Sequence, residues 1–161
     1  MICFQQLAGA AASTIHGRFE TCFDGPPTPE TVLALPEDRL RAAGLSGAKA
    51  ASIRDLAARV LDGDVRLARI GRFDDDTVVA QLTRVRGIGR WTAEMFCMHQ
   101  LRRLDVWPVD DLGVRKGAAI LLGLRAMPAA RDLEPLGDRW RPYRSVAAWY
   151  CWRAADTVTP D

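Results

Sequence analysis

The sequence lacks the features that would carry the chain into or across a membrane. No run of apolar residues approaches the roughly 18 to 20 that a membrane-spanning helix needs. The opening stretch, MICFQQLAGAAAS, has no basic residues ahead of its apolar part, so it does not resemble a secretory signal. It resembles the middle of a helix, and we expect that segments which normally precede it are missing. We expect no membrane partner.

The sequence also has few residues that bind metals. Its four cysteines are scattered, with no CxxC pair and no histidine at ligand spacing, which argues against zinc and iron–sulfur sites. We expect neither a metal nor a cofactor. Cys97 and Cys151 fall within apolar helical patterns, which predicts buried free thiols and a reducing, cytoplasmic compartment.

Neither sign of charge is in large excess. The 22 Lys and Arg residues are nearly balanced by 20 Asp and Glu, which leaves a net charge of +2. This balance excludes neither a nucleic acid nor a small molecule as a partner, because local clustering matters more than the total. With 48% hydrophobic residues, the 161-residue chain can build a core in one domain or in two small helical lobes.

Strand patterns are almost absent, whereas apolar residues recur at helical spacing throughout. The sequence therefore predicts an all-α fold. Ser46 is the expected N-cap of a long helix that ends at Leu61, and Asp76 the expected cap of a helix over 77–85. The other expected helices cover residues 2–19, 30–35, 36–43, 65–70, 91–101, 111–122, 133–140 and 143–155.

The most informative segment is a glycine turn between two expected helices, in the pattern LxxVxGIGxxTA over residues 82–93. Gly87 and Gly89 permit backbone dihedrals that are closed to other residues. Ile88 can fill the space between the helices while the glycine amides face outward and form an anion site. A DNA phosphate suits this site, and so would another anion. A plain helical hairpin is the alternative, which the full pattern disfavours. Three arginines add positive charge around the turn: Arg84, Arg86 and Arg90.

This hairpin is similar to that of the helix-hairpin-helix family. With the downstream segment Pro108-Val109-Asp110-Asp111, it makes the chain resemble the glycosylase branch of that superfamily, of the DNA-3-methyladenine glycosylase II type. The resemblance covers nearly all 161 residues. It is supported by further matches at Gln5-Gln6-Leu7, Gly44-Leu45-Ser46, Lys49-Ala50, Ile53, residues 140–145 and Trp152.

The resemblance implies a two-lobed, all-α HhH-GPD glycosylase domain over residues 1–161, with the helix-hairpin-helix at about 77–101 and the usual N-terminal extension missing. It implies base excision repair, in which alkylated purines such as 3-methyladenine are removed from double-stranded DNA by hydrolysis of the N-glycosidic bond. We expect a monomer in the cytoplasm, associated with the nucleoid if the source is bacterial.

The expected catalytic group is a carboxylate that follows the hairpin by about twenty residues. Breaking an N-glycosidic bond develops positive charge on the sugar, which a carboxylate stabilises while it orients or deprotonates water. Alkylated purines already carry positive charge, so the departing base needs little help from a general acid. In the family, the catalytic position aligns best with Asp111, while Asp110 remains a competitor or a supporting residue. Alternatively, both are helix caps only.

The residue after Gly-x-Gly-Arg is Trp91. Related bifunctional glycosylases with lyase activity place a lysine there to form a Schiff base, which an indole cannot do. The resemblance therefore implies a monofunctional enzyme. It also implies that Trp91, Met95 and Trp152 line a pocket in which an extruded cationic purine is held by stacking and cation–π attraction. Core packing is the alternative for each of them.

The resemblance also implies DNA contacts outside the pocket. Gln6 aligns with the wedge residue that fills the hole left by the flipped nucleotide. The expected DNA-binding residues of the hairpin are Arg86, Gly87, Ile88, Gly89 and Arg90. Four other cations could contact phosphates but are expected to be mainly solvated: Lys49, Arg115, Arg141 and Arg144.

Two other functions fit parts of the sequence. A non-catalytic DNA-binding module would use only the hairpin, and Asp111 and Trp91 would then be dispensable. A glycosylase for mismatched or oxidised bases is the second alternative. Relatives of that kind usually carry an iron–sulfur cluster held by four closely spaced cysteines near the C-terminus, which this sequence does not show.

Overall fold

A computed structural model describes residues 2–5, 7 and 9–157 of the chain. The chain divides by its internal contacts into two compact units, residues 1–90 and residues 91–161. Within the described ranges there are α-helices and short 3-10 helices (η) but no strands. The predicted all-α fold is therefore confirmed.

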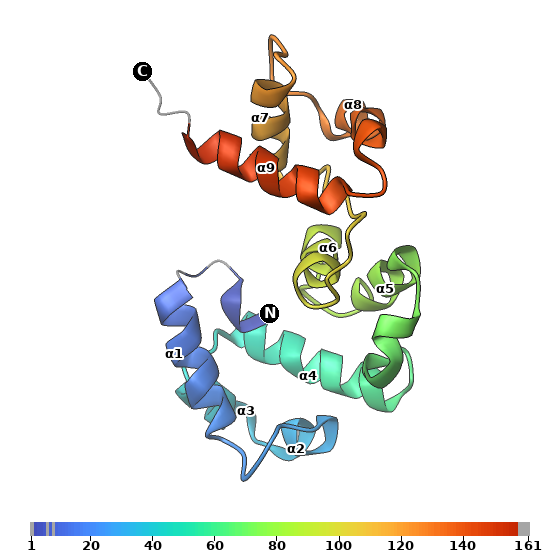
Figure 1. Ribbon diagram of the computed structural model, residues 1–161. Helices are drawn as coiled ribbons and strands as arrows, with labels where there is room; N and C mark the ends of the chain where they lie inside the picture. The colour runs from blue at the N-terminus through green and yellow to red at the C-terminus, as the bar shows by residue number, and fades with distance from the viewer. Residues whose placement is uncertain (1, 6, 8, 158–161) are drawn as a thin grey trace. The chain divides into compact units, whose positions relative to one another are not determined.

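The first unit is organised around α4 (Gly47–Leu61). Ser46 begins this helix as predicted, since its Oγ accepts a hydrogen bond from the backbone N of Lys49 at 3.2 Å. Ala50, Ile53 and Ala57 form its buried stripe. The unit's other elements are η1 (Ile2–Phe4), α1 (Gly9–Glu20), α2 (Pro29–Ala34), α3 (Glu37–Ala42), η2 (Leu67–Arg72) and α5 (Asp75–Leu82). Figure 1 shows α2 and α3 beside α4, against which both pack.

The second unit is built on two long helices, α7 (Leu112–Leu121) and α9 (Arg144–Thr157). Its core comes from α7, α8 (Ala130–Leu133), α9 and the segment before α7, and includes Trp107, Val114 and Leu133. The other elements are α6 (Arg90–His99), which starts at the last residue of the first unit, and η3 (Pro135–Trp140).

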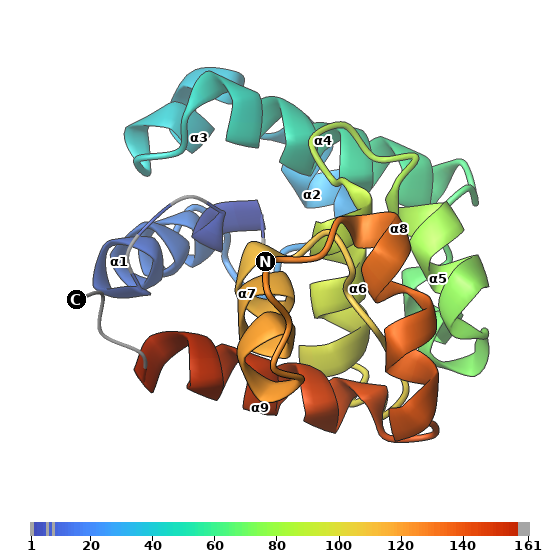
Figure 2. The ribbon, with the colours of Figure 1, turned by 90° about the horizontal axis from the view of Figure 1, so that it is seen from above.

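A glycine sets the approach of α7 to α9. Both ribbon views show α7 running across α9 (Figures 1 and 2). A Cβ added to Gly117 of α7 would lie only 1.8 Å from the carbonyl oxygen of Cys151 in α9. Only glycine lets the two backbones come this close, and the buried Ala118, Ala148 and Cys151 then pack in the same core.

The structure corrects several expected helix boundaries. The continuous helix expected over 2–19 is wrong, because residues 2–4 form η1 and α1 starts at Gly9. The cap of α5 is Asp74, not Asp76: the Asp74 carboxylate accepts from the backbone N of Thr77 at 2.7 Å. The helix expected over 133–140 is split into α8 and η3 at Pro135, which has no N–H to continue a helix.

The close approach of α7 and α9 at Gly117 leads to a prediction about stability. Gly117→Ala should lower the free energy of unfolding by about 3 kcal/mol or more, because the added methyl group meets backbone that cannot move aside cheaply. Gly17→Ala is the matched control. No atom lies within 4 Å of the Cβ added there in α1, so it should stabilise by about 0.5–1 kcal/mol. Urea denaturation measures both, and equal effects would contradict the account.

Candidate functional site

The carboxylate of Asp111 accepts hydrogen bonds from three segments of the second unit. Asp111 is the N-cap of α7, and its Oδ1 accepts from the backbone N of Val114 at 2.8 Å. The indole Nε1 of Trp152, from α9, donates to the same oxygen at 2.8 Å. The indole Nε1 of Trp91, from α6, donates to Oδ2 at 2.6 Å. The carboxylate is therefore held in one orientation from three sides.

These bonds leave one side of the carboxylate open. An ionised carboxylate offers about four acceptor positions, two on each oxygen. Among the described residues, two N–H groups fill those of Oδ1 and one fills a position on Oδ2. Oδ2 thus keeps one acceptor position for a water molecule or for another group outside the protein.

Two of the three predicted pocket residues contact this carboxylate. Trp91 and Trp152 both contact Asp111 directly, and Trp91 still exposes 45% of its surface. Met95 is half-buried and lies one turn after Trp91 on α6, a spacing that places both on the same face of the helix. The structure brings Trp91, Asp111 and Trp152 into one site.

Asp110 differs from Asp111 in its surroundings. Its side chain is exposed, and no hydrogen bond or ion pair of its carboxylate is found within the described part of the chain. Asp111, by contrast, is half-buried and fully engaged on Oδ1. The geometry favours Asp111 as the organised carboxylate of the pair.

Two residues that the sequence analysis missed shape this site. A Cβ on Gly113 would lie 2.7 Å from Cδ1 of Trp152 and 3.2 Å from Oδ1 of Asp111, so only glycine leaves room for the indole to reach the carboxylate. A glycine in the first turn of a helix, two residues after the candidate carboxylate, was the available signal. His99 packs its ring on that of Trp152, with centroids 6.1 Å apart and an interplanar angle of 20°.

Cys151 lies next to the site but is not reactive. Burial, and secondarily the negative charge of Asp111, raise the pKa of the Cys151 thiol to about 11. The thiol therefore stays protonated at neutral pH. All four cysteines are free, and Cys97 and Cys151 are buried as predicted.

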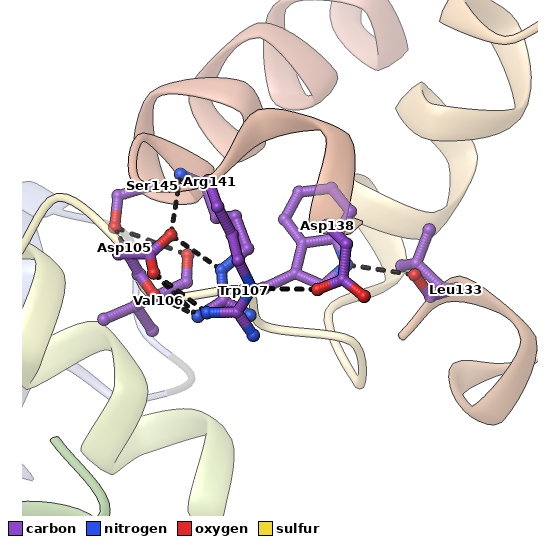
Figure 3. A network of polar contacts seen from close by, with 8 residues as sticks. Asp105, Val106, Trp107, Leu133, Asp138, Arg141 and Ser145 are labelled. Atoms are coloured by element: carbon purple, nitrogen blue, oxygen red, sulfur yellow. Dashed lines mark hydrogen bonds and ion pairs between the residues drawn. The ribbon is translucent and has the colours of Figure 1, made fainter. Parts of the chain in front are cut away.

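The segment that leads to Asp111 is fixed to the start of α9 by an ion-pair network (Figure 3). Arg144 donates from Nε to Oδ1 of Asp105 at 2.7 Å, and from Nη2 to Oδ2 at 3.1 Å and to the backbone oxygen at 2.7 Å. Arg141 adds a bond from Nη1 to Oδ2 of Asp105 at 3.1 Å. The hydrogen bond from Arg144 is the main cause that lowers the pKa of the Asp105 carboxyl.

Further bonds continue this attachment toward Asp111. The backbone N of Val106 donates to Oγ of Ser145 at 3.0 Å, and Nε1 of Trp107 donates to the carbonyl of Leu133 at 3.1 Å (Figure 3). Trp107 also packs against Gly137, where a Cβ would lie 2.5 Å from the indole. The residues before Asp111 are thus held although they form no regular element.

The glycine turn lies at the end of the first unit and has the predicted features except at Gly89, which has no positive φ and where no atom lies within 4 Å of an added Cβ. Gly87 adopts a left-handed conformation with φ of +74°, which is strained for other residues. Ile88 is buried, while Arg86, Gly89 and Arg90 are exposed. The turn connects α5 to α6, so the expected helix–turn–helix over about 77–101 is present with slightly earlier boundaries.

The turn is anchored to α4 by contacts that the sequence did not reveal. The backbone N of Arg86 donates to Oδ2 of Asp55 at 2.7 Å, and this bond is the main cause that lowers the pKa of Asp55. A Cβ on Gly87 would lie 2.5 Å from Oγ of Ser52, so α4 fits closely against the turn. Gln5 donates from Nε2 to the carbonyl of Gly87 at 3.0 Å.

The remaining predicted residues have different outcomes. Gln6 lies outside the described residues, so its wedge role stays a prediction. The expectation that four cations are mainly solvated is wrong for Lys49, Arg115 and Arg144, which are partly buried and bound to the protein, whereas Arg141 is exposed as expected and also bonds Asp105. Lys49 bonds the carbonyl of Cys3, Arg115 that of Pro128, and Arg141 and Arg144 bond Asp105.

Within the described ranges, no three His, Cys, Asp or Glu side chains gather in a way that could hold a metal ion. No helix in the same ranges has both the length and the apolar character needed to span a membrane.

Comparisons with known proteins agree on one family. The family model described as "HhH-GPD superfamily base excision DNA repair protein" matches residues 1–142. DNA-3-methyladenine glycosylase 1 of Schizosaccharomyces pombe is 33% identical over 154 residues, which are 94% of this chain and 68% of that protein.

Solved structures give the same result. The S. pombe 3-methyladenine DNA glycosylase in complex with abasic DNA superposes with a TM-score of 0.79 at 32% identity, and the match covers 99% of this chain and 80% of that one. A DNA-3-methyladenine glycosidase of Bacillus halodurans gives a TM-score of 0.86 at 39% identity, covering 97% and 72%.

The Asp105–Arg144 pair makes stability depend on pH. The pKa of the Asp105 carboxyl in the folded protein lies below its ordinary value of about 4. The ion pair therefore stabilises the fold at pH values above about 4, and this stabilisation is lost as the pH falls through the folded-state pKa. Arg144→Met should lower the free energy of unfolding at pH 7 by about 2 kcal/mol. The difference from wild type should shrink by pH 3.

Chemical denaturation at pH 7 and pH 3 measures this difference. Arg131→Met is the matched control, because the Arg131 side chain is 88% exposed and its removal should change stability at neither pH. A destabilisation by Arg144→Met that is the same at both pH values would show that the carboxylate of Asp105 is not what the arginine stabilises.

Proposed function

This chain belongs to the HhH-GPD superfamily of base excision DNA repair proteins, and on that premise we propose that it is a monofunctional DNA glycosylase for alkylated purines. It would hydrolyse the N-glycosidic bond of bases such as 3-methyladenine in double-stranded DNA and leave an abasic site. The observation that carries this proposal is the Asp111 carboxylate, which is oriented by the indole N–H groups of Trp91 and Trp152.

In this proposal Asp111 acts on the sugar rather than on the base. As the glycosidic bond stretches, positive charge develops on the deoxyribose, and an oriented carboxylate stabilises it. The open acceptor position on Oδ2 is suited to take a proton from the attacking water. The capping bond from Val114 and the bond from Trp152 both hold Oδ1, so the carboxylate does not have to reorient during the reaction.

The leaving base needs no general acid in this scheme. An alkylated purine carries its positive charge before the bond breaks and leaves as a neutral base. The indole N–H of Trp91 is bound to Asp111, which fixes the edge of the ring. Because the ring is exposed, one of its faces remains available for stacking. Trp152 and Met95 would complete a pocket for the extruded purine, with cation–π attraction favouring the charged base.

Hydrolysis without strand cleavage is the expected outcome. A lyase step needs an amine that forms a Schiff base with the sugar, and the position after Gly87-Ile88-Gly89-Arg90 is Trp91, which has none. Asp110 is exposed beside Asp111 and would have at most a supporting role.

The first unit would supply the contacts with the DNA backbone. The turn at Gly87 and Gly89 precedes the N-terminus of α6, where exposed backbone amides and the helix dipole favour a phosphate. Arg86 and Arg90 are exposed beside it, and Ile88 holds the turn from inside. We propose that residues 1–161 act together as one glycosylase domain, as a monomer, in the cytoplasm or nucleoid of its cell.

The alternative of a non-catalytic DNA-binding module uses the same turn. It gives no reason for two indole N–H groups to converge on one carboxylate beside an exposed aromatic face. The two functions differ in whether free base is released, so base release decides between them.

The catalytic proposal predicts the effect of Asp111→Asn. Asparagine is as good an N-cap as aspartate, and its amide oxygen can keep the bonds from Val114 and Trp152, so the variant should keep α7. Its NH2 group cannot accept from Trp91, so the variant loses that bond together with the negative charge that stabilises the sugar. We expect single-turnover release of alkylated base to fall by about 100-fold or more, with binding to abasic DNA nearly unchanged.

Asp110→Asn is the matched control, since it removes the same charge one residue upstream from an exposed side chain. It should release base at close to the wild-type rate. Full activity of Asp111→Asn together with an inactive Asp110→Asn would move the catalytic role to Asp110. Full activity of both variants would contradict a mechanism that depends on either carboxylate.

A further inference from the structure

The segment before α5 repeats with a period of three. Residues 66–73 read Arg-Leu-Ala-Arg-Ile-Gly-Arg-Phe, so a cation, an apolar residue and, twice, a small residue recur in order. In the structure Leu67–Arg72 is the 3-10 helix η2, which has three residues per turn, so side chains at i and i+3 lie directly above one another. The period of the sequence therefore becomes three separate rows along η2.

The apolar row faces the protein. Ile70 is 5% exposed and Phe73 is half-buried, while Leu67 at the start of the row is exposed. The arginine row is turned away by about a third of a revolution, and its three members are all exposed: Arg66, Arg69 and Arg72. Burial of Ile70 thus fixes the direction in which the arginines point.

The three arginines are not used in the fold. In the part of the chain that the structure describes, none of their guanidinium groups takes part in an ion pair or a side-chain hydrogen bond. Two other arginines of the first unit have acidic partners, since Arg59 pairs with Asp55 and Asp64, and Arg84 with Asp64. Three charged side chains in one row repel one another, and an anion that contacts all three relieves the repulsion.

The row begins beside the glycine turn, within the same unit. The backbone N of Arg66 donates to Oε1 of the buried Gln81 at 2.9 Å, which ties the start of η2 to α5, the helix that leads into the turn. Arg84 and Asp64 approach to 3.9 Å and add a second link between the two segments. The arginines therefore lie on an element that is tied to the helix leading into the turn.

The dimensions of the row suit a nucleic-acid backbone. At about 2.0 Å per residue, Arg66 to Arg72 spans roughly 12 Å. One DNA strand carries a charge about every 3.4 Å along the helix axis, so such a row faces about three phosphates. The intervening row of Ala68 and Gly71 has no long side chain to keep a backbone away.

We propose that Arg66, Arg69 and Arg72 form a second phosphate-binding surface, which continues the DNA contact of the glycine turn along one strand. The proposal rests on the proposed function for its partner, duplex DNA, and adds a contact surface outside the turn and the Asp111 site. It concerns affinity and not the chemical step.

The test is the salt dependence of binding. Each phosphate contact contributes about 0.9 to the slope of log K against log salt concentration. Fluorescence anisotropy with an undamaged duplex and with an abasic duplex, between 50 and 300 mM salt, should show a slope lower by about 2 to 3 in Arg66→Ala/Arg69→Ala/Arg72→Ala. The corresponding triple Lys variant should keep the wild-type slope, because it keeps the charges.

The matched control is Arg18→Ala/Arg39→Ala/Arg125→Ala, which removes three exposed charges that do not form a row. Its slope should fall by less than about 1. Equal slopes in the row variant and this control would overturn the proposal, as would a triple Lys variant that binds no better than the Ala variant.

The proposed function is tested separately in the same samples. Single-turnover base release by the wild-type chain measures the glycosylase activity independently of the salt slope. If the wild-type chain releases no base, the glycosylase proposal fails while the slope measurement still decides whether the row binds phosphates.

Discussion

The carboxylate of Asp111 and its three N–H donors are the interaction on which the rest of the second unit depends. A cap alone would need only the bond from Val114. The indoles of Trp91 and Trp152 make the same carboxylate the meeting point of α6, α7 and α9. The bonds that connect the three helices therefore also set the direction in which the open acceptor position on Oδ2 faces.

Two glycines and one ion pair make this convergence possible. Gly117 lets α9 approach α7, and Gly113 leaves space for the Trp152 ring beside Asp111. Arg144, at the start of α9, holds Asp105 and so fixes the irregular segment that ends at Asp111. A side chain at Gly117, or a neutral residue at Arg144, would disturb the carboxylate without touching it, whereas a side chain at Gly113 would press directly on the carboxylate.

Much of the fold and part of the site could be predicted from the sequence. Helical periodicity gave the all-α class and the Ser46 cap, and the spacing around Gly87 and Gly89 gave the turn. The resemblance to glycosylases identified Asp111 as the candidate carboxylate and Trp91 and Trp152 as candidate pocket residues. It could not give the bonds between them, because these join residues 20 and 41 positions apart, which no local pattern records. Likewise, the run of acids at 74–76 offers three possible caps, and only the backbone geometry selects Asp74.

The most direct test of the central claim is to identify what the chain releases from a duplex that contains one alkylated purine. The account predicts free base and a strand that stays intact until alkali cleaves it at the abasic site. Absence of free base would contradict the role of the oriented carboxylate. Strand cleavage by the protein itself, with a covalent adduct trapped by borohydride, would contradict hydrolysis at a site whose key position is Trp91.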